Sequence, residues 1–320
     1  RPNEAVQLAA YQDYFQGAPA MKRVIVRNVA ESSAQRLLLE QGDIDVARNL
    51  SVTDVASIAS VEGVRIQDEP RGRILYMGLN QKDEVLSNPA VIEAMKYLVD
   101  YDGIADSFLK GMFAPHQTFL PKGYLGVLED RPWTLDVEKA KKLIEDADMS
   151  GRTITTKVRD LREYVDVAQA LQASMAEAGL TLNIEQMTGA QVLDAYRARE
   201  VPIFIGEWGP DYSDPNTNAA TFAFNPDNSD EAQATGLLAW RNAYAVPQDM
   251  NEATVAATLE QDTDKRAQMY IDIQKQYQAE APIVPLFQRI ENTGLRDNVQ
   301  NWVSGGALTS VMYRQVTKGE

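Results

Sequence analysis

The segment 205–216 has the sequence IGEWGPDYSDPN and gathers carboxylates and aromatic rings among glycines and prolines. Carboxylates accept hydrogen bonds from an ammonium group or from hydroxyls, and aromatic rings offer a flat wall or a cation–π surface. The same residue types are typical of an ordinary turn with solvated acids and a packed tryptophan. As a binding site, the segment would act through Asp211, Trp208 and Tyr212.

Two arginines form a second candidate group. Arg159 and Arg162 follow a predicted strand, and a guanidinium group can hold a carboxylate through two parallel hydrogen bonds. The alternative is an ion pair with Asp160 or Glu163 on a solvated surface. The sequence leaves both interpretations open.

The composition limits the chemistry that the chain can perform. Cysteine is absent and His116 is the single histidine, so thiolate chemistry, disulfides and histidine-rich metal sites are excluded. Dinucleotide, phosphate-loop and α/β-hydrolase signatures are missing as well. We therefore predict no catalytic residue, no metal site and no cofactor. A cleft hydrolase that pairs Glu207 with Asp211 or Asp214 is the alternative from a different class.

Length and charge narrow the class of protein further. The chain has 320 residues, which predicts two domains, and its net charge of −15 disfavours binding to nucleic acid or to an anionic membrane. No apolar run reaches the roughly 18 residues that a transmembrane helix needs. The sequence starts Arg-Pro-Asn-Glu, without the pattern of a signal peptide.

The elements that must position the candidate residues follow an alternating pattern. Apolar periodicity predicts three strands separated by two helices, a β-α-β-α-β unit typical of a three-layer α/β domain. Open α/β sheets bind ligands at the carboxyl ends of their strands, where both candidate groups lie. The unit comprises strands 153–158, 180–186 and 202–207 and helices 162–178 and 190–199.

Outside this unit, capping residues and proline or glycine signals define further elements. Residues 115–133, rich in proline and glycine, are predicted to form a long loop. We predict helices at 32–41 (ended by Gly42), from Asn88-Pro89, from Asp136 to about 147 and at 264–280, and strands at 44–47, 64–67, 74–79 and 283–288.

Several segments together resemble the family 5 extracellular solute-binding proteins of the dipeptide- and oligopeptide-binding type. The resemblance extends along essentially the whole chain in the family's order. The segments that carry it are 14–19 (YFQGAP), 41–45 (QGDID), 94–100 (AMKYLVD), 121–124 (PKGY) and 208–215 (WGPDYSDP).

This resemblance implies a two-lobed α/β periplasmic binding protein (type II, large peptide-binding subclass), of which the chain would be the C-terminal portion. Residues 1–80 would be the remainder of lobe I, 81–288 lobe II and 289–320 the return into lobe I. Hinge strands are expected near 76–81 and 286–292. The N-terminal part of lobe I is expected to be missing.

The resemblance also implies a function. The protein would capture a short peptide in the periplasm and deliver it to the transmembrane subunits of an ABC permease, as a monomer and without catalysis. Asp211 would hold the peptide's ammonium group, and Arg159 or Arg162 its carboxylate. An oligosaccharide or an opine-like solute is the alternative ligand on the same scaffold, and a structural fragment that binds nothing is a third possibility.

Overall fold

The computed structural model describes residues 4–304 and 311–319 of a chain that divides into two compact units. Unit 1 comprises residues 1–71 and 289–320, and unit 2 comprises residues 72–288. The chain passes from one unit to the other within two long strands, β4 (Val64–Leu79) and β9 (Ile283–Arg296). The first division thus falls at residues 71 and 72, inside β4, whereas we expected it near residue 80.

β4 differs from the prediction of two short strands at 64–67 and 74–79. Polar residues separate the two predicted strands, but the structure continues as one strand of 16 residues. Pro70 explains part of this, because its ring fixes φ and restricts Glu69 to extended conformations. β9 likewise continues beyond the predicted end at residue 288.

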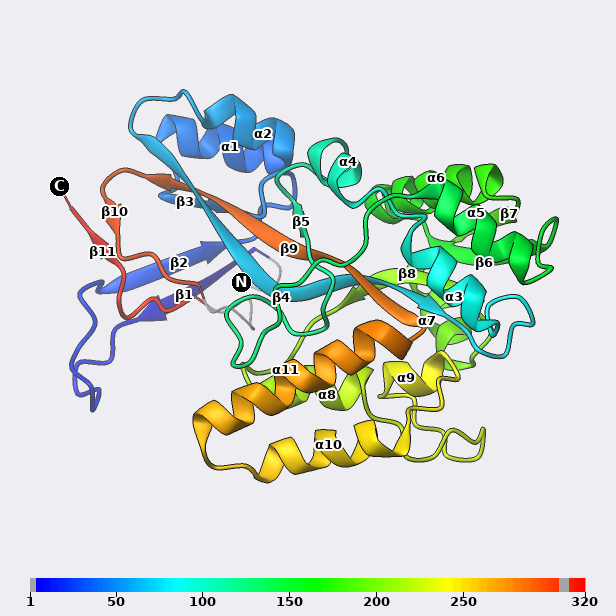
Figure 1. Cartoon of the computed structure of the whole chain (residues 1–320). Coiled ribbons are helices and arrows are strands. Elements are labelled where there is room, and N and C mark those ends of the chain that lie inside the picture. The colour runs from blue at the N-terminus through cyan, green and yellow to red at the C-terminus, as the bar shows by residue number, and fades with distance from the viewer. Residues whose placement is uncertain (1–3, 305–310, 320) are drawn as a thin grey trace. The chain divides into compact units, whose positions relative to one another are not determined.

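Unit 1 contains several short helices and strands (Figure 1), and Leu39, Ala47, Leu50, Ile58 and Val64 form a small core in it. Its helices are α1 (Ser32–Gln41) and α2 (Val52–Ile58), and β3 (Val46–Arg48) pairs antiparallel with β9. Gly42 ends α1 in the left-handed conformation at φ 81°, as predicted. Two further pairs are antiparallel: β1 (Ala5–Ala9) with β2 (Arg23–Arg27), and β10 (Val299–Gln300) with β11 (Thr317–Lys318).

In unit 2 the predicted β-α-β-α-β order is confirmed, but its strands do not share one sheet. β6 (Thr153–Arg159) and β7 (Thr181–Met187) form a parallel pair, with α6 (Arg162–Glu177) between them in the chain. α7 (Gly189–Arg197) leads to β8 (Ile203–Trp208), which instead pairs antiparallel with β4. The third strand therefore belongs to a five-stranded sheet of order β3-β9-β4-β8, with β5 (Phe113–Pro115) on β9.

A side chain explains why β8 does not extend the parallel pair. The Thr156 hydroxyl of β6 donates to the Ile203 carbonyl oxygen at 2.6 Å and accepts from the Ile203 N–H at 3.2 Å. These bonds satisfy backbone groups that a regular ladder would otherwise pair. The prediction that all three strands belong to one three-layer α/β unit is corrected accordingly, because β8 lies in the other sheet.

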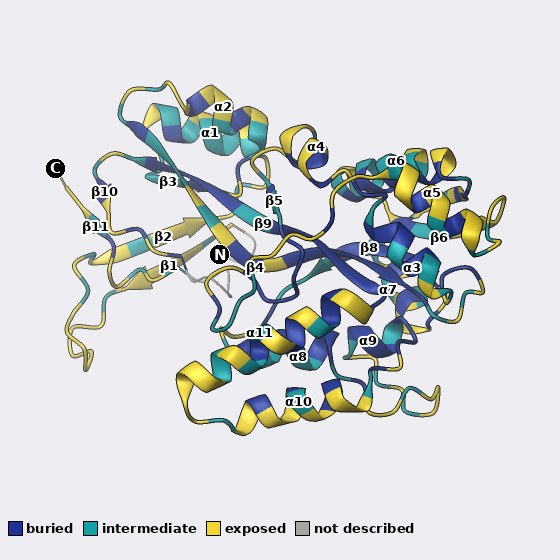
Figure 2. Cartoon of the chain, in the orientation of Figure 1, coloured by how far each residue is buried: buried dark blue, intermediate teal, exposed yellow. Residues whose placement is uncertain are grey.

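Residues 74–79 of β4 and the first four residues of β8 are buried on both faces, which explains the nearly continuous apolar sequence of these stretches (Figure 2). Leu75 and Ile205 point into a core shared with α3 (Pro89–Lys96), α4 (Tyr101–Asp106), α5 (Val137–Asp146) and α6. Tyr76 and Phe204 point to the opposite face. There they pack in a second core with residues of α8 (Pro215–Phe222), α9 (Leu238–Arg241), α10 (Gln248–Leu259) and α11 (Thr263–Glu280).

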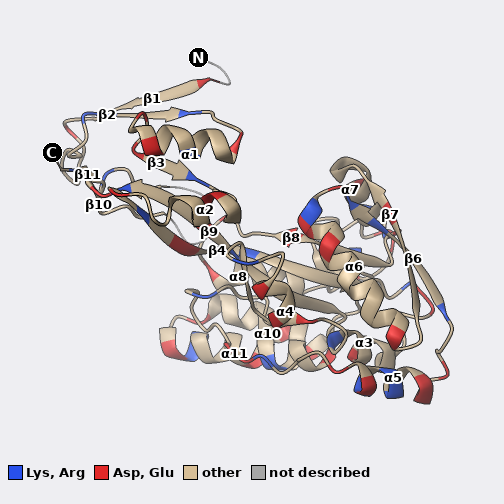
Figure 3. Cartoon of the chain, turned by 90° about the horizontal axis from the view of Figure 1, so that it is seen from above, with Lys and Arg blue, Asp and Glu red and all other residues tan. Residues whose placement is uncertain are grey.

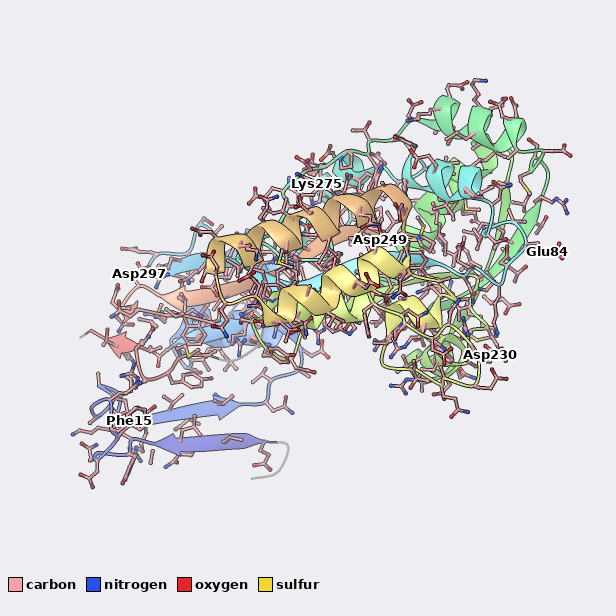
Figure 4. The ribbon with its side chains drawn as sticks, turned by 60° about the horizontal axis from the view of Figure 1, so that its bottom comes forward. Phe15, Glu84, Asp230, Asp249, Lys275 and Asp297 are labelled. Atoms are coloured by element: carbon pink, nitrogen blue, oxygen red, sulfur yellow. The ribbon has the colours of Figure 1, made fainter. Side chains whose placement is uncertain are left out.

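α10 and α11, which both contribute residues to this second core, pack side by side (Figure 4). The Gln276 amide of α11 donates to Asp249 of α10 at 3.1 Å. Acidic and basic residues are interspersed over the helices of unit 2 (Figure 3). Within the described residues, no helix combines the length and apolarity needed to cross a membrane.

Candidate functional site

The segment 209–214 joins β8 to α8, and its first anchor is an aromatic contact. Trp208, the last residue of β8, is half-buried, and its ring lies perpendicular to that of Phe222 with centroids 5.8 Å apart. An edge-to-face contact of this kind restricts the orientation of the indole. The segment therefore starts from a fixed point at the edge of the second core of unit 2.

Asp214 is the second anchor. Its carboxylate caps α8 by accepting from the Asn216 N–H at 2.9 Å, and Arg266 donates to both of its oxygens, at 2.8 and 2.9 Å. Burial acts to raise the pKa of Asp214, but the hydrogen bonds from Arg266 and Asn216 outweigh it, and the pKa lies below its usual value. Asp214 is therefore an ionised structural group.

Tyr124 supports the middle of the segment from the loop 115–133. Its hydroxyl donates to the Tyr212 carbonyl oxygen at 3.5 Å, and Thr217 Oγ1 donates to the same oxygen at 3.4 Å. Burial raises the pKa of Tyr124 to about 12, against a smaller opposite effect of a hydrogen bond with Ser213. Tyr124 lies in the segment 121–124 that carries the family resemblance, and it is not among the site residues predicted from the sequence.

The side chains of Asp211 and Tyr212 project from this supported backbone. Tyr212 is 54% exposed, and Asp211 is exposed too. In residues 4–304 and 311–319 the Asp211 carboxylate has no ion pair or hydrogen bond. An ionised carboxylate held on a fixed backbone and free of protein partners can accept hydrogen bonds from an ammonium group of a ligand.

The two predicted arginines differ in their contacts. Arg162 is fully solvated, with 91% of its side chain exposed, and its Nε lies 3.4 Å from Asp166, one turn later in α6. A solvated ion pair was one of the two interpretations of the arginines, and the partner of Arg162 in the structure is Asp166. Arg159 ends β6, and its side chain lies against Gly189, where an added Cβ would be 2.7 Å from Nε. No hydrogen bond or ion pair joins either arginine to the segment 209–214 within the described part of the chain.

Glu207 lies on the opposite face of β8 from Trp208, because side chains alternate along a strand. Its Oε1 accepts a hydrogen bond from the Tyr164 hydroxyl of α6 at 2.8 Å. Glu207 and Asp214 thus both serve contacts between elements of unit 2. The structure does not assemble either of them with Asp211 into a carboxylate pair.

His116 is a packed histidine of the loop 115–133. It is 3% exposed, and its Nε2 lies 2.6 Å from the Leu120 carbonyl oxygen and 3.0 Å from Thr118 Oγ1. Burial lowers the pKa of His116 to about 4. Among residues 4–304 and 311–319 there is no group of three or more His, Asp or Glu side chains suited to a metal ion.

Comparison with known proteins identifies the relatives of this chain. The family model of the bacterial extracellular solute-binding proteins, family 5 (Middle), matches residues 1–230. The probable D,D-dipeptide-binding periplasmic protein DdpA of Escherichia coli (strain K12) is 26% identical over 295 residues, covering 92% of this chain and 56% of that protein. The chain therefore spans a little over half the length of this relative.

Solved structures of other proteins share the fold of this chain. The structure of HbpA2 from Haemophilus parasuis superposes with a TM-score of 0.87 at 21% identity, covering 100% of this chain and 62% of that one. The periplasmic binding protein DppA from Helicobacter pylori, in complex with the peptide STSA, superposes with a TM-score of 0.79 at 20% identity, covering 100% and 61%. With the family model matching most of its length and its α/β fold shared with these proteins, the chain belongs to the family 5 bacterial extracellular solute-binding proteins.

Proposed function

We propose that this protein captures short peptides as the substrate-binding component of an ABC importer. Its family and the dipeptide-binding name of its Escherichia coli relative support a peptide ligand, as does the peptide held by the Helicobacter pylori protein. The observation that carries the proposal is the Asp211 carboxylate, which is exposed and unpaired among the described residues, on a segment anchored at both ends.

In this proposal Asp211 binds the ammonium group at the N-terminus of the peptide. Since the backbone around Asp211 is anchored before the ligand arrives, little ordering cost is added to binding. Tyr212 offers an exposed ring beside the carboxylate. Trp208 contributes less surface, because it is half-buried against Phe222.

We assign the peptide's carboxylate to Arg159 rather than Arg162. Arg162 already pairs with Asp166, whereas Arg159 has no ion-pair partner within the described residues. Because Gly189 has no side chain, the Arg159 side chain can lie along the start of α7. A planar guanidinium group suits two-point recognition of a carboxylate.

The proposal extends to the architecture of the transporter. Unit 1 would belong to lobe I and unit 2 would be lobe II, with β4 and β9 as the hinge strands. Ligand contacts with both lobes would favour the closed form, which is delivered to the membrane permease. We propose that the protein acts in the periplasm, as expected for its family, and as a monomer.

Binding without catalysis fits the site better than hydrolysis. A hydrolase with two carboxylates needs one group with a raised pKa to act as the acid. The pKa of Asp214 is shifted in the opposite direction, and Glu207 is engaged by Tyr164. An oligosaccharide would depend on stacking against exposed aromatic rings. Of the two aromatic site residues, Tyr212 is exposed and Trp208 is half-buried, so Tyr212 would be the main stacking surface for a sugar.

Isothermal titration calorimetry with the purified chain tests the proposal. Di- and tripeptides with a free N-terminus should bind one per chain, and N-acetylation or Asp211→Asn should weaken binding at least tenfold, because both remove the charge pair. Asp106→Asn is the matched control, since Asp106 is an exposed aspartate of unit 2 outside the site. Equal affinity for free and acetylated peptides, or no binding by a peptide library, would contradict the proposal.

A further inference from the structure

One helix supports both loops of the candidate site. α11 contacts the segment 209–214 through Arg266 and the loop 115–133 through Gln274. From this arrangement we infer that Arg266 is a positioning residue for ligand binding, which sets the conformation of the segment that carries Asp211. The inference rests on the proposed function and adds a residue that touches no ligand itself.

The guanidinium group of Arg266 forms four hydrogen bonds, one of them from Nη2 to the Tyr270 hydroxyl at 3.3 Å. Its two terminal nitrogens donate to the two oxygens of Asp214, and its Nε donates to the Ala257 carbonyl oxygen of α10 at 2.9 Å. The group also lies over the Tyr270 ring, 5.3 Å from its centroid. Only 19% of the Arg266 side chain is exposed. Because the donors form a rigid fork, the position of α11 dictates the position of the Asp214 carboxylate.

Asp214 passes this constraint to Asp211. The two residues are three positions apart, and Asp214 is also fixed as the N-cap of α8. At the other end, Trp208 is held by Phe222. The residues between these anchors have few backbone torsions to vary, so a change at either anchor shifts the Asp211 carboxylate.

The second loop is attached to the same helix. Gln274 Nε2 donates to the Gly126 carbonyl oxygen at 2.6 Å, and Gln274 Oε1 accepts from the Leu128 N–H at 3.2 Å. Gly126, with φ 71°, lies so close to Ala267 that an added Cβ would overlap the backbone of α11. Tyr124 of this loop then reaches the Tyr212 carbonyl oxygen. α11 therefore determines the positions of both loops and of the bond between them.

The test compares Arg266→Met and Arg266→Lys with the neighbouring control Lys265→Met. Lys265 is exposed and pairs with the partly buried Glu260 at 2.5 Å. Lys265→Met removes the same charge from the same turn of α11 as Arg266→Met. For peptides with a free N-terminus we expect Arg266→Met to raise Kd about tenfold, Arg266→Lys to give an intermediate value, and Lys265→Met to stay within twofold. The double variant Asp214→Asn with Arg266→Met should bind peptide no more weakly than the single variant of lower affinity. Both changes break the same contact, the ion pair between Arg266 and Asp214.

Hydrogen exchange, which needs no ligand, tests the positioning role of Arg266 separately from the proposed peptide binding. Hydrogen exchange of the amides at 209–214 should accelerate in Arg266→Met and not in Lys265→Met, whether or not a peptide has been found. If Asp211→Asn abolishes peptide binding while Arg266→Met stays within twofold of the parent, the positioning role is overturned and the proposed function stands. If no peptide binds the parent, the proposed function fails, and unchanged exchange would overturn the positioning role as well. Asp214→Asn provides the same comparison if Arg266→Met does not fold.

Discussion

The hydroxyl of Thr156 forms two hydrogen bonds with the backbone of Ile203, donating to its carbonyl oxygen at 2.6 Å and accepting from its N–H at 3.2 Å. Thr156 belongs to the parallel pair β6 and β7, and Ile203 begins β8 in the larger sheet. Both residues are fully buried. This contact connects the parallel pair to the five-stranded sheet at the strand that leads to the candidate site.

Replacing Thr156 by valine keeps the shape of the side chain and removes both hydrogen bonds. Two buried backbone groups of Ile203 would then lack this partner, so we expect a loss of about 1–3 kcal/mol in the free energy of unfolding. Urea denaturation of Thr156→Val measures the loss. Thr156→Ser, which retains the hydroxyl, should lose clearly less. Equal stability of the valine variant and the parent would contradict the structural role.

His116 predicts a specific dependence of stability on pH. Burial lowers its pKa from 6.5 to about 4 in the folded protein, so between these values the unfolded state binds a proton that the folded state does not. Lowering the pH from 6.5 to 4 therefore favours unfolding, by up to about 3 kcal/mol at about 1.4 kcal/mol per pKa unit.

The single histidine allows a direct measurement of this effect. NMR titration of the His116 ring should show no protonation near pH 6.5 in the folded protein. In His116→Gln, whose amide can still donate to the Leu120 carbonyl oxygen, the fall in stability over this pH range should be smaller. A ring that titrates near pH 6.5 while the protein remains folded would refute the prediction.

Gly126 predicts a close approach between the loop 115–133 and α11. Its φ of 71° and the overlap of an added Cβ with Ala267 should make Gly126→Ala destabilising, by about 1–3 kcal/mol, and should weaken peptide binding. Gly123→Ala is the matched control, because Gly123 also has a positive φ, 91°, but no atom lies near its added Cβ. Thermal unfolding compares the stability of the two variants, and calorimetry compares their affinity for peptides. Equal losses in both variants would show that only backbone strain matters.

Local patterns in the sequence predicted many of the individual elements. α1 ends at Gly42 and α5 begins after Asp136, because capping depends on residues within one turn of the helix end. The alternation from β6 to β8 was predicted for the same reason, since apolar periodicity belongs to each segment by itself. The segment 209–214 stood out through its own residue types.

Contacts between residues far apart in the chain decided the pairing of the strands and the support of the candidate site. The antiparallel pairing of β8 with β4, and the continuity of β4 through residues 64–79, depend on strands far apart in the chain. The support of the candidate site also comes from distant residues, since Tyr124 and Arg266 reach the segment 209–214 from 88 and 52 positions away, counted from Tyr212 and Asp214. No local spacing encodes such contacts. The sequence by itself determined which side chains could bind a ligand, whereas the tertiary structure decided that Asp211 remains exposed and Asp214 is used for structure, because only packing brings Arg266 to one carboxylate and not the other.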